Sequence, residues 1–546
     1  MKNRGFTLVE LLAVIVVLSI IALIGFYSIG NVVETSEDNS NKITMENYAK
    51  AVDQAKIIYE MNNPDTEIVM NSGWIKENVK FEKATVKCES ITNEKSINLY
   101  GCTINNSNKK YCYIDNKVIE CEENMLAYKE AILNGNDPDL LNNSLIPVVY
   151  DEAKSAWVVA DIKKEWYNYA KQEWANAVIL NSGVAKNVGD TVIVPTTSST
   201  TSEVKAMFVW IPRYEYHIEG QYGTHLDGTA GTKALPGQIE IKFIPKSQTI
   251  ADPNYILHPG FAWDTDNNGI LATDSSITKN EYVSGIWVGK FKMTGTIDAP
   301  SVLPNTSMVR KQNLKNQFTA SQMFSTYLSD SSNTDSHIMK NTEWGAMAYL
   351  SQSIYGKYGN SNYTGANKGV YKNTSTATGR STGSYTGESY VCVYNNIADR
   401  GNGTGSCGGG ASTTGNITGI YDASGDQGGV YEFTMGYYAG AKDTQIWTNA
   451  GFTEPLEAKY TNAYMIKISN GVIRENSTPS TGHAFIETAG WYNQYANFGS
   501  VYYTWSVRSS GDGDAECSGI FSLNTDYGKG IINAGVSSRP TLLLEP

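Results

Sequence analysis

The stretch from Trp491 to Asp514 carries the side chains best suited to holding a ligand. Aromatic rings alternate there with amides, hydroxyls and carboxylates, a composition typical of loops that recognise another surface. A second interpretation is that Trp491, Tyr503 and Trp505 pack in a core, and we expect this of some of them. The candidate ligand-contacting residues are Trp491, Tyr492, Asn493, Tyr495, Asn497, Tyr502, Tyr503, Arg508, Asp512 and Asp514.

A second set of oxygen-bearing side chains follows the spacing at the start of a calcium loop. The candidate ligands are Asp264, Asp266, Asn268 and Asp274. Carboxylate and amide oxygens at alternate positions are the ligands that calcium prefers. However, Ser275 stands where such loops carry a glutamate, and Asp274 comes one residue early. A plain Asp/Asn/Gly turn without metal is the more common outcome, so calcium is the one cofactor that we consider, and none is certain.

The seven cysteines favour disulfides rather than a metal site. They form a first cluster, a second pair and a single residue: Cys88, Cys102, Cys112 and Cys121; Cys392 and Cys407; and Cys517. Clustered cysteines in an exported chain indicate disulfides. Four cysteines allow three pairings, of which Cys88–Cys102 with Cys112–Cys121 is the most local. No CxxC pair is present and His is scarce at 5, which argues against zinc.

Two functional classes are disfavoured by what the sequence lacks. No nucleophile triad, phosphate loop or paired catalytic carboxylate stands out, and the histidines are scattered, so we do not expect an enzyme. For His337, packing is the expected role. The net charge is −12, from 43 basic and 55 acidic residues, and no long basic cluster exists, so we expect no nucleic-acid partner.

The first 26 residues determine how the rest of the chain is placed relative to a membrane. A short basic leader ends at Gly5, and an apolar run from Phe6 to Phe26 contains one charge, Glu10. About 20 apolar residues can cross the ~30 Å hydrocarbon core as a helix. A carboxylate inside such a run costs about 2.5–3.5 kcal/mol and therefore needs a partner. The plausible cleavage point lies before the apolar run, whereas a secretory signal is cut after it.

This arrangement resembles the type IV prepilin and pseudopilin leader. The resemblance implies that a prepilin peptidase cuts after Gly5 and methylates Phe6. It also implies that Glu10 neutralises the N-terminal amine of a neighbouring subunit. The expected partners are then the peptidase, the membrane, and other pilin subunits through the N-terminal helix. The expected location is the cytoplasmic membrane, as a single-pass protein, before assembly, and the cell surface or a pilus after processing.

Several phrases in the larger, C-terminal part resemble a second family. They are MFVWIPRYEY (207–216), GIWVGKFKM (285–293), HIMKNTEWGAMAYLSQSIYG (337–356), GGVYEFTMG (428–436) and GIFSLNTDYGKGIINAGVSSRPTLLL (519–544). Together they resemble the formylglycine-generating-enzyme-like, or sulfatase-modifying-factor, domain, which implies a C-type-lectin-like fold. That enzyme binds copper through a pair of cysteines near its C-terminus. Here only Cys517 stands in that region, so the enzymatic activity is not expected.

The expected fold class is α+β, with many loops. Positions 45, 48, 49, 52, 55 and 59 follow a helical rhythm that should stop near Pro64. Residues 111–120 predict a hairpin around Asp115-Asn116. Strands are expected near 146–150 and 156–160, and the aromatics of 166–178 are expected to pack. The predicted parts are a leader (1–5), a pilin helix (6–61, with 6–26 in the membrane), a small disulfide-bonded pilin head (62–121), a bridge ending in a Ser/Thr-rich linker (122–203), and a C-type-lectin-like domain (204–546).

The sequence therefore predicts a pilin-like protein, a minor pilin or pseudopilin, that displays a lectin-like head. Its 35 Tyr against 14 Phe suit an exposed recognition surface or a β-rich domain. The expected role is adhesion or surface recognition of a cell-surface, glycan or protein ligand. Two alternatives stay open: a structural pseudopilin of a secretion or DNA-uptake system, and a surface enzyme derived from the sulfatase-modifying fold. Related lectin-like domains are targets of diversity-generating retroelements, and this chain could be one.

Overall fold

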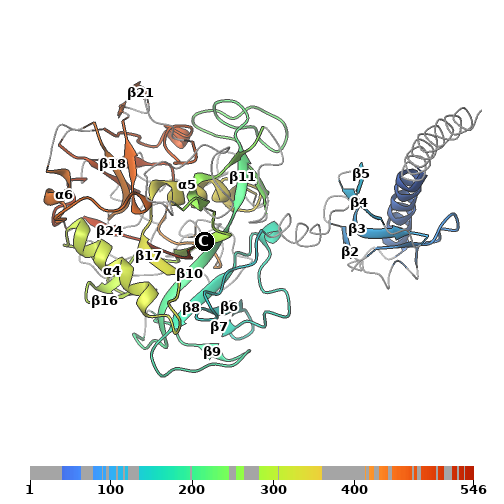
Figure 1. Cartoon of the computed structure of the whole chain (residues 1–546), viewed down its shortest axis with the longest axis horizontal. Helices are drawn as coiled ribbons and strands as arrows, with labels where there is room; N and C mark the ends of the chain where they lie inside the picture. The colour runs from blue at the N-terminus through green and yellow to red at the C-terminus, as the bar shows by residue number, and fades with distance from the viewer. Residues whose placement is uncertain are drawn as a thin grey trace, which may run out of the picture. The chain divides into compact units, whose positions relative to one another are not determined.

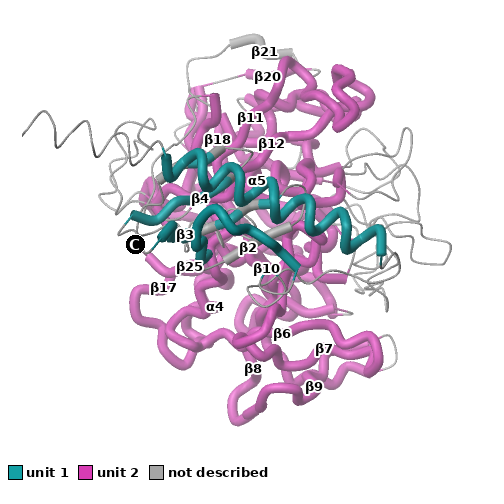
Figure 2. Tube along the Cα trace, turned by 90° about the vertical axis from the view of Figure 1, so that its right-hand side faces the viewer, with its two compact units in different colours: residues 1–129 teal, residues 130–546 magenta. Residues whose placement is uncertain are grey.

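The computed structural model divides the chain into two compact units, residues 1–129 and residues 130–546 (Figure 2). Among the described residues, which begin at Ser40, no helix is both long and apolar enough to cross a membrane. The predicted membrane segment, 6–26, lies outside them. The structure describes residues 40–62, 75, 78–88, 90–93, 97–105, 109–114, 117–120, 135–196, 199–244, 254–263, 282–304, 306–359, 412, 417–423, 430–440, 445–465, 467–469, 472–475, 481–499, 502–509, 519–525, 528–533 and 535–545.

Unit 1 consists of a helix over residues 40–62 packed on a small sheet. Met45, Tyr48, Ala49 and Val52 are buried on one helix face, as their helical spacing predicts. The sheet has the strand order β1-β3-β4-β5, and β2 pairs with β3. Its strands are β1 (Val86–Lys87), β2 (Ser90–Asn93), β3 (Ile97–Ile104), β4 (Lys110–Ile114) and β5 (Lys117–Glu120).

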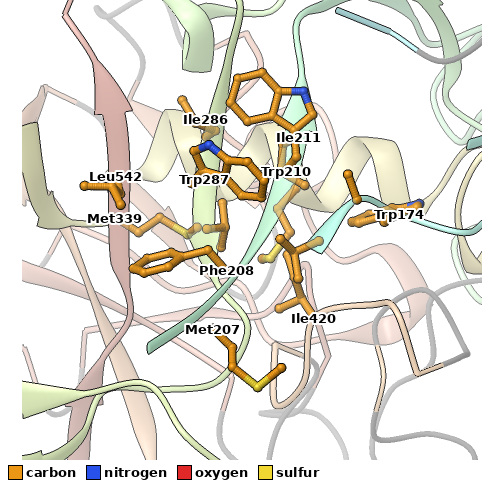
Figure 3. Close-up of a cluster of buried hydrophobic side chains, with 14 of the residues drawn as sticks. Trp174, Met207, Phe208, Trp210, Ile211, Ile286, Trp287, Met339, Ile420 and Leu542 are labelled. Carbon is orange, nitrogen blue, oxygen red and sulfur yellow. The ribbon is translucent and has the colours of Figure 1, made fainter. Parts of the chain in front are cut away.

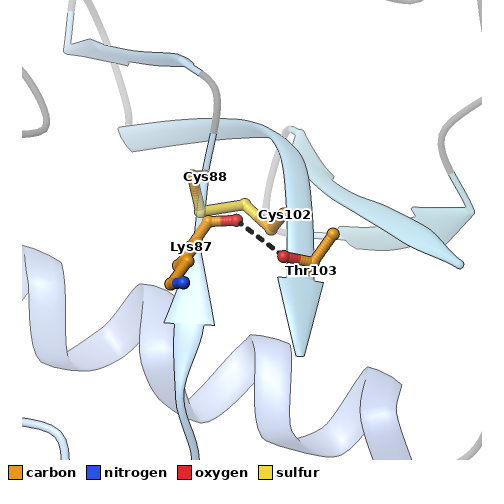
Figure 4. The surroundings of a disulfide bond; sticks show 4 residues. All are labelled: Lys87, Cys88, Cys102 and Thr103. Carbon is orange, nitrogen blue, oxygen red and sulfur yellow. Dashed lines mark hydrogen bonds between the residues drawn. A yellow bond between two sulfur atoms is a disulfide. The ribbon is translucent and has the colours of Figure 1, made fainter. Parts of the chain in front are cut away.

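Two local predictions for unit 1 are confirmed. Strands β4 and β5 pair in an antiparallel hairpin, with Ile114 opposite Lys117, so the turn falls at residues 115–116. A disulfide joins Cys88 to Cys102, beside the hydrogen bond that the Thr103 hydroxyl donates to the Lys87 carbonyl (Figure 4). Cys112 is also disulfide-bonded. Cys121, Cys392, Cys407 and Cys517 lie outside the described residues.

Unit 2 is a mixed α+β structure built on an eight-stranded sheet. The order is β17-β25-β14-β10-β8-β6-β7-β9. Figure 1 labels β17, β10, β8, β6, β7 and β9 of this sheet. Its central strands are nearly continuous apolar runs because both faces are covered; β10 is buried along almost its whole length. The eight strands are β6 (Ile146–Asp151), β7 (Ala156–Val159), β8 (Asn176–Leu180), β9 (Thr191–Val192), β10 (Val204–Pro212), β14 (Gly285–Gly289), β17 (Thr334–Ile338) and β25 (Pro540–Leu544).

Large aromatic side chains fill the core around this sheet (Figure 3). Trp210 and Trp287 face each other across β10 and β14, with ring centroids 5.2 Å apart. Gly285 permits this approach, because a Cβ there would lie 2.4 Å from the Trp210 ring. Tyr169 and Trp174, from the aromatic stretch predicted to pack, are buried in the same core.

The described part of unit 2 also contains a second sheet and the helices α4, α5 and α6. The second sheet has the order β19-β18-β22-β23, with β24 parallel to β18. Its strands are β18 (Tyr431–Tyr438), β19 (Asn462–Tyr464), β22 (Trp505–Arg508), β23 (Leu523–Asn524) and β24 (Val536–Ser538). The helices are α4 (Leu314–Thr326), α5 (Asn341–Ser351) and α6 (Ile446–Asn449).

The remaining elements are short. They are the strands β11 (Tyr214–His217), β12 (Glu240–Phe243), β13 (Ile256–Leu257), β15 (Thr294–Thr296), β16 (Ala299–Ser301), β20 (Lys467–Ser469) and β21 (Val472–Glu475), with 3-10 turns η1 (Tyr169–Lys171), η2 (Pro259–Phe261), η4 (Lys357–Gly359), η6 (Ala458–Tyr460) and η7 (Trp491–Asn493).

The predicted boundary at residue 203 does not separate two structures. The strand pair predicted near 146–160 is present as β6 and β7, but β6, β7, β8 and β9 belong to the same sheet as β10. Strands β8 and β10 are hydrogen-bonded neighbours. The Ser/Thr-rich stretch is therefore a loop between two strands of one sheet. Its composition resembles a linker because exposed loops and linkers share polar, small residues.

Candidate functional site

The predicted ligand segment begins in a turn whose backbone is left-handed at three of four positions. Gly490, Tyr492 and Asn493 have φ of 74°, 57° and 56°. Such values are costly for non-glycine residues and persist only where surrounding contacts hold them. Trp491 is fully buried, with its ring edge-on to Phe521.

Tyr492 is the second anchor of this turn. Its ring stacks on Phe521, and its hydroxyl exchanges hydrogen bonds with the amide of Gln352 at 2.8–2.9 Å. The prediction that Trp491 and Tyr492 contact a ligand is wrong, because both side chains pack inward. For Trp491 this agrees with the second interpretation, packing in a core. Their inward anchoring leaves the next residue, Asn493, exposed.

Residues 494–498 form an extended strip held on both sides by backbone hydrogen bonds. On one side, the Leu523 amide donates to the Tyr495 carbonyl and the Asn497 amide donates to the Leu523 carbonyl, both at 2.9 Å. On the other side, Phe498 and Ile468 exchange backbone hydrogen bonds of 2.8 and 3.0 Å. The side-chain amide of Gln494 also accepts from the Phe521 amide. The strip therefore continues the second sheet beyond β23.

Side chains along the strip alternate strictly between inside and outside. Gln494, Ala496 and Phe498 are buried, whereas Asn493 is exposed and Tyr495 and Asn497 are half-exposed. This period of two is what an extended backbone imposes. We call Asn493, Tyr495 and Asn497 the outer row.

The register of the sheet tells which other side chains share the face of the outer row. Ala496 is bridged to Leu523, so these two point to one face together with Phe498. Tyr495 and Asn497 therefore point to the opposite face, which also carries Asn524 and its partner Val507. Asn524 is buried, so it forms part of the floor beside the row.

Two tyrosines before β22 are accessible, and Tyr502 is the most exposed aromatic group among the described residues of the segment. Tyr502 is 77% exposed, and Tyr503 is half-exposed. The Lys529 ammonium lies 4.9 Å from the centre of the Tyr503 ring, within cation–π distance. Lys529 was not a candidate in the sequence analysis, because it is near Tyr503 only in the fold, where the Trp505 amide donates a backbone hydrogen bond to the Gly528 carbonyl.

Arg508 requires a correction of the same kind as Trp491. Its guanidinium is buried and donates to the carbonyls of His483 and Ala484 and to the side-chain oxygen of Asn341. Burial lowers the pKa of Arg508 to about 9. Arg508 thus ties β22 to the start of α5 and to the 483–484 loop, and it does not face a ligand. Asp512 and Asp514 lie outside the described residues.

A buried ion network lies at the N-terminus of α5. The ring nitrogens of His337 contact Asp335 at 2.5 Å and Glu343 at 3.0 Å, and Lys340 lies 3.5 Å from Glu343. Burial alone would lower the pKa of His337, but the two carboxylates outweigh it and raise the pKa to about 9. Burial likewise opposes ionisation of Glu343, yet His337 and Lys340 hold its pKa at about 2. His337 is therefore a charged tether rather than a simple packing residue.

A second set of buried titratable groups surrounds Glu487, and within it the Nε2 of His258 has no hydrogen-bond partner. Glu487 accepts hydrogen bonds from the hydroxyls of Tyr216 and Tyr349 and from the Gly482 amide. Burial raises the pKa of Glu487 and lowers those of His258 and His483, the last to about 3. Within the described part of the chain, no group of three or more His, Cys, Asp or Glu side chains could hold a metal ion.

Two predicted sites cannot be placed from the structure. The possible calcium ligands Asp264, Asp266, Asn268 and Asp274 lie outside the described residues, as do Gly5, Phe6 and Glu10 of the leader. These assignments remain predictions.

Comparison with known proteins identifies the leader. Residues 1–26 match the family model of the prokaryotic N-terminal methylation motif, which confirms the prepilin-like leader. The match covers the leader and the apolar run only. It supports membrane insertion, processing by a prepilin peptidase and assembly with other pilins. No curated protein matches the chain.

Two solved structures resemble the chain weakly. The Major Tropism Determinant U1 variant is 11% identical, with a TM-score of 0.22 over 77% of this chain and 98% of its own. The I1 variant of the same protein is also 11% identical, with a TM-score of 0.24 over 73% of this chain and 94% of its own. Similarity at this level carries no argument about the function of this chain. The resemblance to the formylglycine-generating-enzyme-like domain stays a prediction.

Proposed function

We propose that this protein is a pilin-like surface protein whose large head, unit 2, binds a ligand for adhesion or surface recognition. The leader supports export and assembly through the N-terminal helix. The observation that carries the binding role is the outer row. Tyr495 and Asn497 present a phenol and an amide from an extended backbone that is hydrogen-bonded on both sides, and Asn493 adds a second amide from the left-handed turn before it. A rigid backbone lowers the entropic cost of binding.

The proposed role is binding rather than catalysis. Asp335, His337 and Glu343 are paired with each other, and Glu487 accepts from two tyrosine hydroxyls. The outer row carries amides and a phenol and no general base. Such groups hold a ligand by hydrogen bonds and ring contacts. A glycan and a protein epitope both fit this chemistry.

The proposal is tested with the fragment 130–546 in a glycan and host-cell binding screen. This fragment contains whole sheets and whole hydrophobic clusters of unit 2. Binding should be lost in the variant N493A/Y495A/N497A, and each single substitution should weaken it about 5- to 30-fold, as loss of a ligand hydrogen bond or ring contact does. The matched control is N449A, an exposed asparagine on α6.

Three results bear on the proposal. Loss of binding in the outer-row variant but not in N449A would support it. Equal binding by wild type and the outer-row variant would move the site elsewhere and refute the assignment. A folded fragment that binds no cell and no glycan would favour the structural pseudopilin alternative.

A further inference from the structure

Four stretches of unit 2 that are distant in sequence meet at one surface. The Leu314 amide donates to the Gly530 carbonyl at 2.8 Å, and the Lys311 amide donates to the Asn533 carbonyl at 2.9 Å. The Lys315 amide donates to the carbonyl of Ala450 at 3.0 Å. The stretches 310–315, 445–453, 502–509 and 528–533 are thus held together by main-chain hydrogen bonds, next to α4 and α6.

Two of these stretches, 310–315 and 528–533, contain lysines, and none of the four contains an acidic residue. This is unusual in a chain of net charge −12. The nearest acids in sequence are Glu454, which is exposed, and Asp443 and Asp526, which lie outside the described residues. Lys311 and Lys529 are exposed and Lys315 is half-exposed. Within the described residues of these four stretches, every charged side chain is therefore basic.

The same surface exposes adjacent apolar side chains. Ile531 is 45% exposed, Ile532 is 67% exposed and Tyr502 is 77% exposed. Neighbouring exposed isoleucines cost solvation free energy and indicate a contact surface. We define the basic–apolar surface by Lys311, Lys315, Tyr502, Lys529, Ile531 and Ile532.

We propose that the basic–apolar surface binds an anionic lipid bilayer. Exposed aliphatic groups with an interfacial tyrosine, flanked by lysines, fit the boundary between acyl chains and anionic headgroups. The leader also supports a lipid partner, because its motif indicates that the chain is inserted into a membrane before assembly. A bilayer is therefore tethered to unit 2, at a high effective concentration, from the moment of export. The head would rest on the lipid until the subunit enters a fibre.

The test is co-sedimentation of the fragment 130–546, which lacks the apolar N-terminal run, with lipid vesicles. We expect binding to vesicles of equal parts phosphatidylglycerol and phosphatidylcholine, none to phosphatidylcholine alone, and loss of binding at high salt. Removal of each lysine should weaken binding about fivefold, so K311E/K529E should bind at least about 25-fold more weakly. I531S/I532S should weaken binding about tenfold or more.

A matched control exists in the same unit. Ile162 is 58% exposed and lies beside two lysines, but Asp161 and Glu165 neighbour them and pair with Lys164 and Lys171. The variant I162S/K164E should bind vesicles like the wild type. The outer-row variant N493A/Y495A/N497A should also bind like the wild type, which separates this inference from the proposed ligand site.

Three results would refute lipid binding by the basic–apolar surface. It is refuted if the folded fragment does not sediment with anionic vesicles, or if it does so equally well with both surface variants. It is also refuted if K311E/K529E loses binding to cells while no form of the fragment binds vesicles, because the surface then docks a protein.

Discussion

The His337 network should make the stability of unit 2 depend on pH in a specific direction. The folded pKa of His337 is about 9, against 6.5 for an ordinary histidine. The folded state therefore holds a proton that the unfolded chain has released between these values. The resulting stabilisation is fully present below pH 6.5 and is lost as the pH rises through 9. At 1.36 kcal/mol for each pH unit, the rise in pKa corresponds to about 3 kcal/mol.

The variant H337Q isolates this contribution. It removes the titrating group, so that Asp335 loses the imidazolium and Glu343 keeps only Lys340 as a cation; over this pH range it should therefore be destabilised most at pH 6.5. The difference in unfolding free energy between wild type and H337Q should shrink by about 3 kcal/mol between pH 6.5 and 9.5. Urea unfolding of the fragment 130–546, followed by tryptophan fluorescence at several pH values, measures that difference.

Wild type must be compared with H337Q because a buried lysine changes the pH dependence of stability in the opposite direction. Burial lowers the pKa of Lys357 to about 7, so its contribution favours the folded state increasingly as the pH rises above 7. The wild-type slope alone could therefore be flat. A difference between wild type and H337Q that stays constant within about 1 kcal/mol from pH 6.5 to 9.5 would refute the assigned network.

Three further predictions concern stability. In α5, a Cβ on Gly345 would lie 1.8 Å from the Gly482 carbonyl oxygen, so G345A should lower the unfolding free energy by about 2–3 kcal/mol. The control is G183A, where nothing lies within 4 Å and where the positive φ alone should cost about 1 kcal/mol. An equal loss of unfolding free energy in both variants would contradict the close packing at Gly345. Removing the Cys88–Cys102 disulfide, whose cysteines are 14 residues apart, should cost unit 1 about 3 kcal/mol and leave the melting of unit 2 unchanged in calorimetry of residues 40–546. A fragment 204–546 lacks β6 to β9 and should aggregate, because β10 becomes an unpaired apolar edge. Size-exclusion chromatography of this fragment beside the fragment 130–546 checks the prediction. A monodisperse fragment 204–546 would support the predicted domain boundary at residue 203.

Local features of the fold followed from local sequence. The amphipathic rhythm of residues 45–52 gave the buried face of the first helix, and Asp115-Asn116 gave the β4–β5 turn. The Cys88–Cys102 pair was the most local pairing available. In each case the residues that determine the feature lie within about one or two dozen positions of each other.

The candidate site was only partly predictable, because composition does not reveal direction. Trp491 and Asn493 are two residues apart, yet one is buried and the other exposed, since a left-handed turn reverses the simple alternation between them. The inward orientation of Arg508 depends on hydrogen bonds to Asn341 and His483, which are far from it in sequence. The basic–apolar surface was missed for the same reason, because its lysines come from separate stretches and form no run in the sequence.

The place of β25 in the main sheet has a consequence for biogenesis. This strand, residues 540–544, lies between β17 and β14, and pairs with residues more than 200 positions earlier, such as His337 with Thr541. Every other strand of that sheet is synthesised before it. The sheet therefore stays split in two until almost the whole head has been synthesised. Until then the apolar strand β14 and the largely polar strand β17 both lack a partner on the side that β25 fills, so a prematurely terminated chain would expose both unpaired edges.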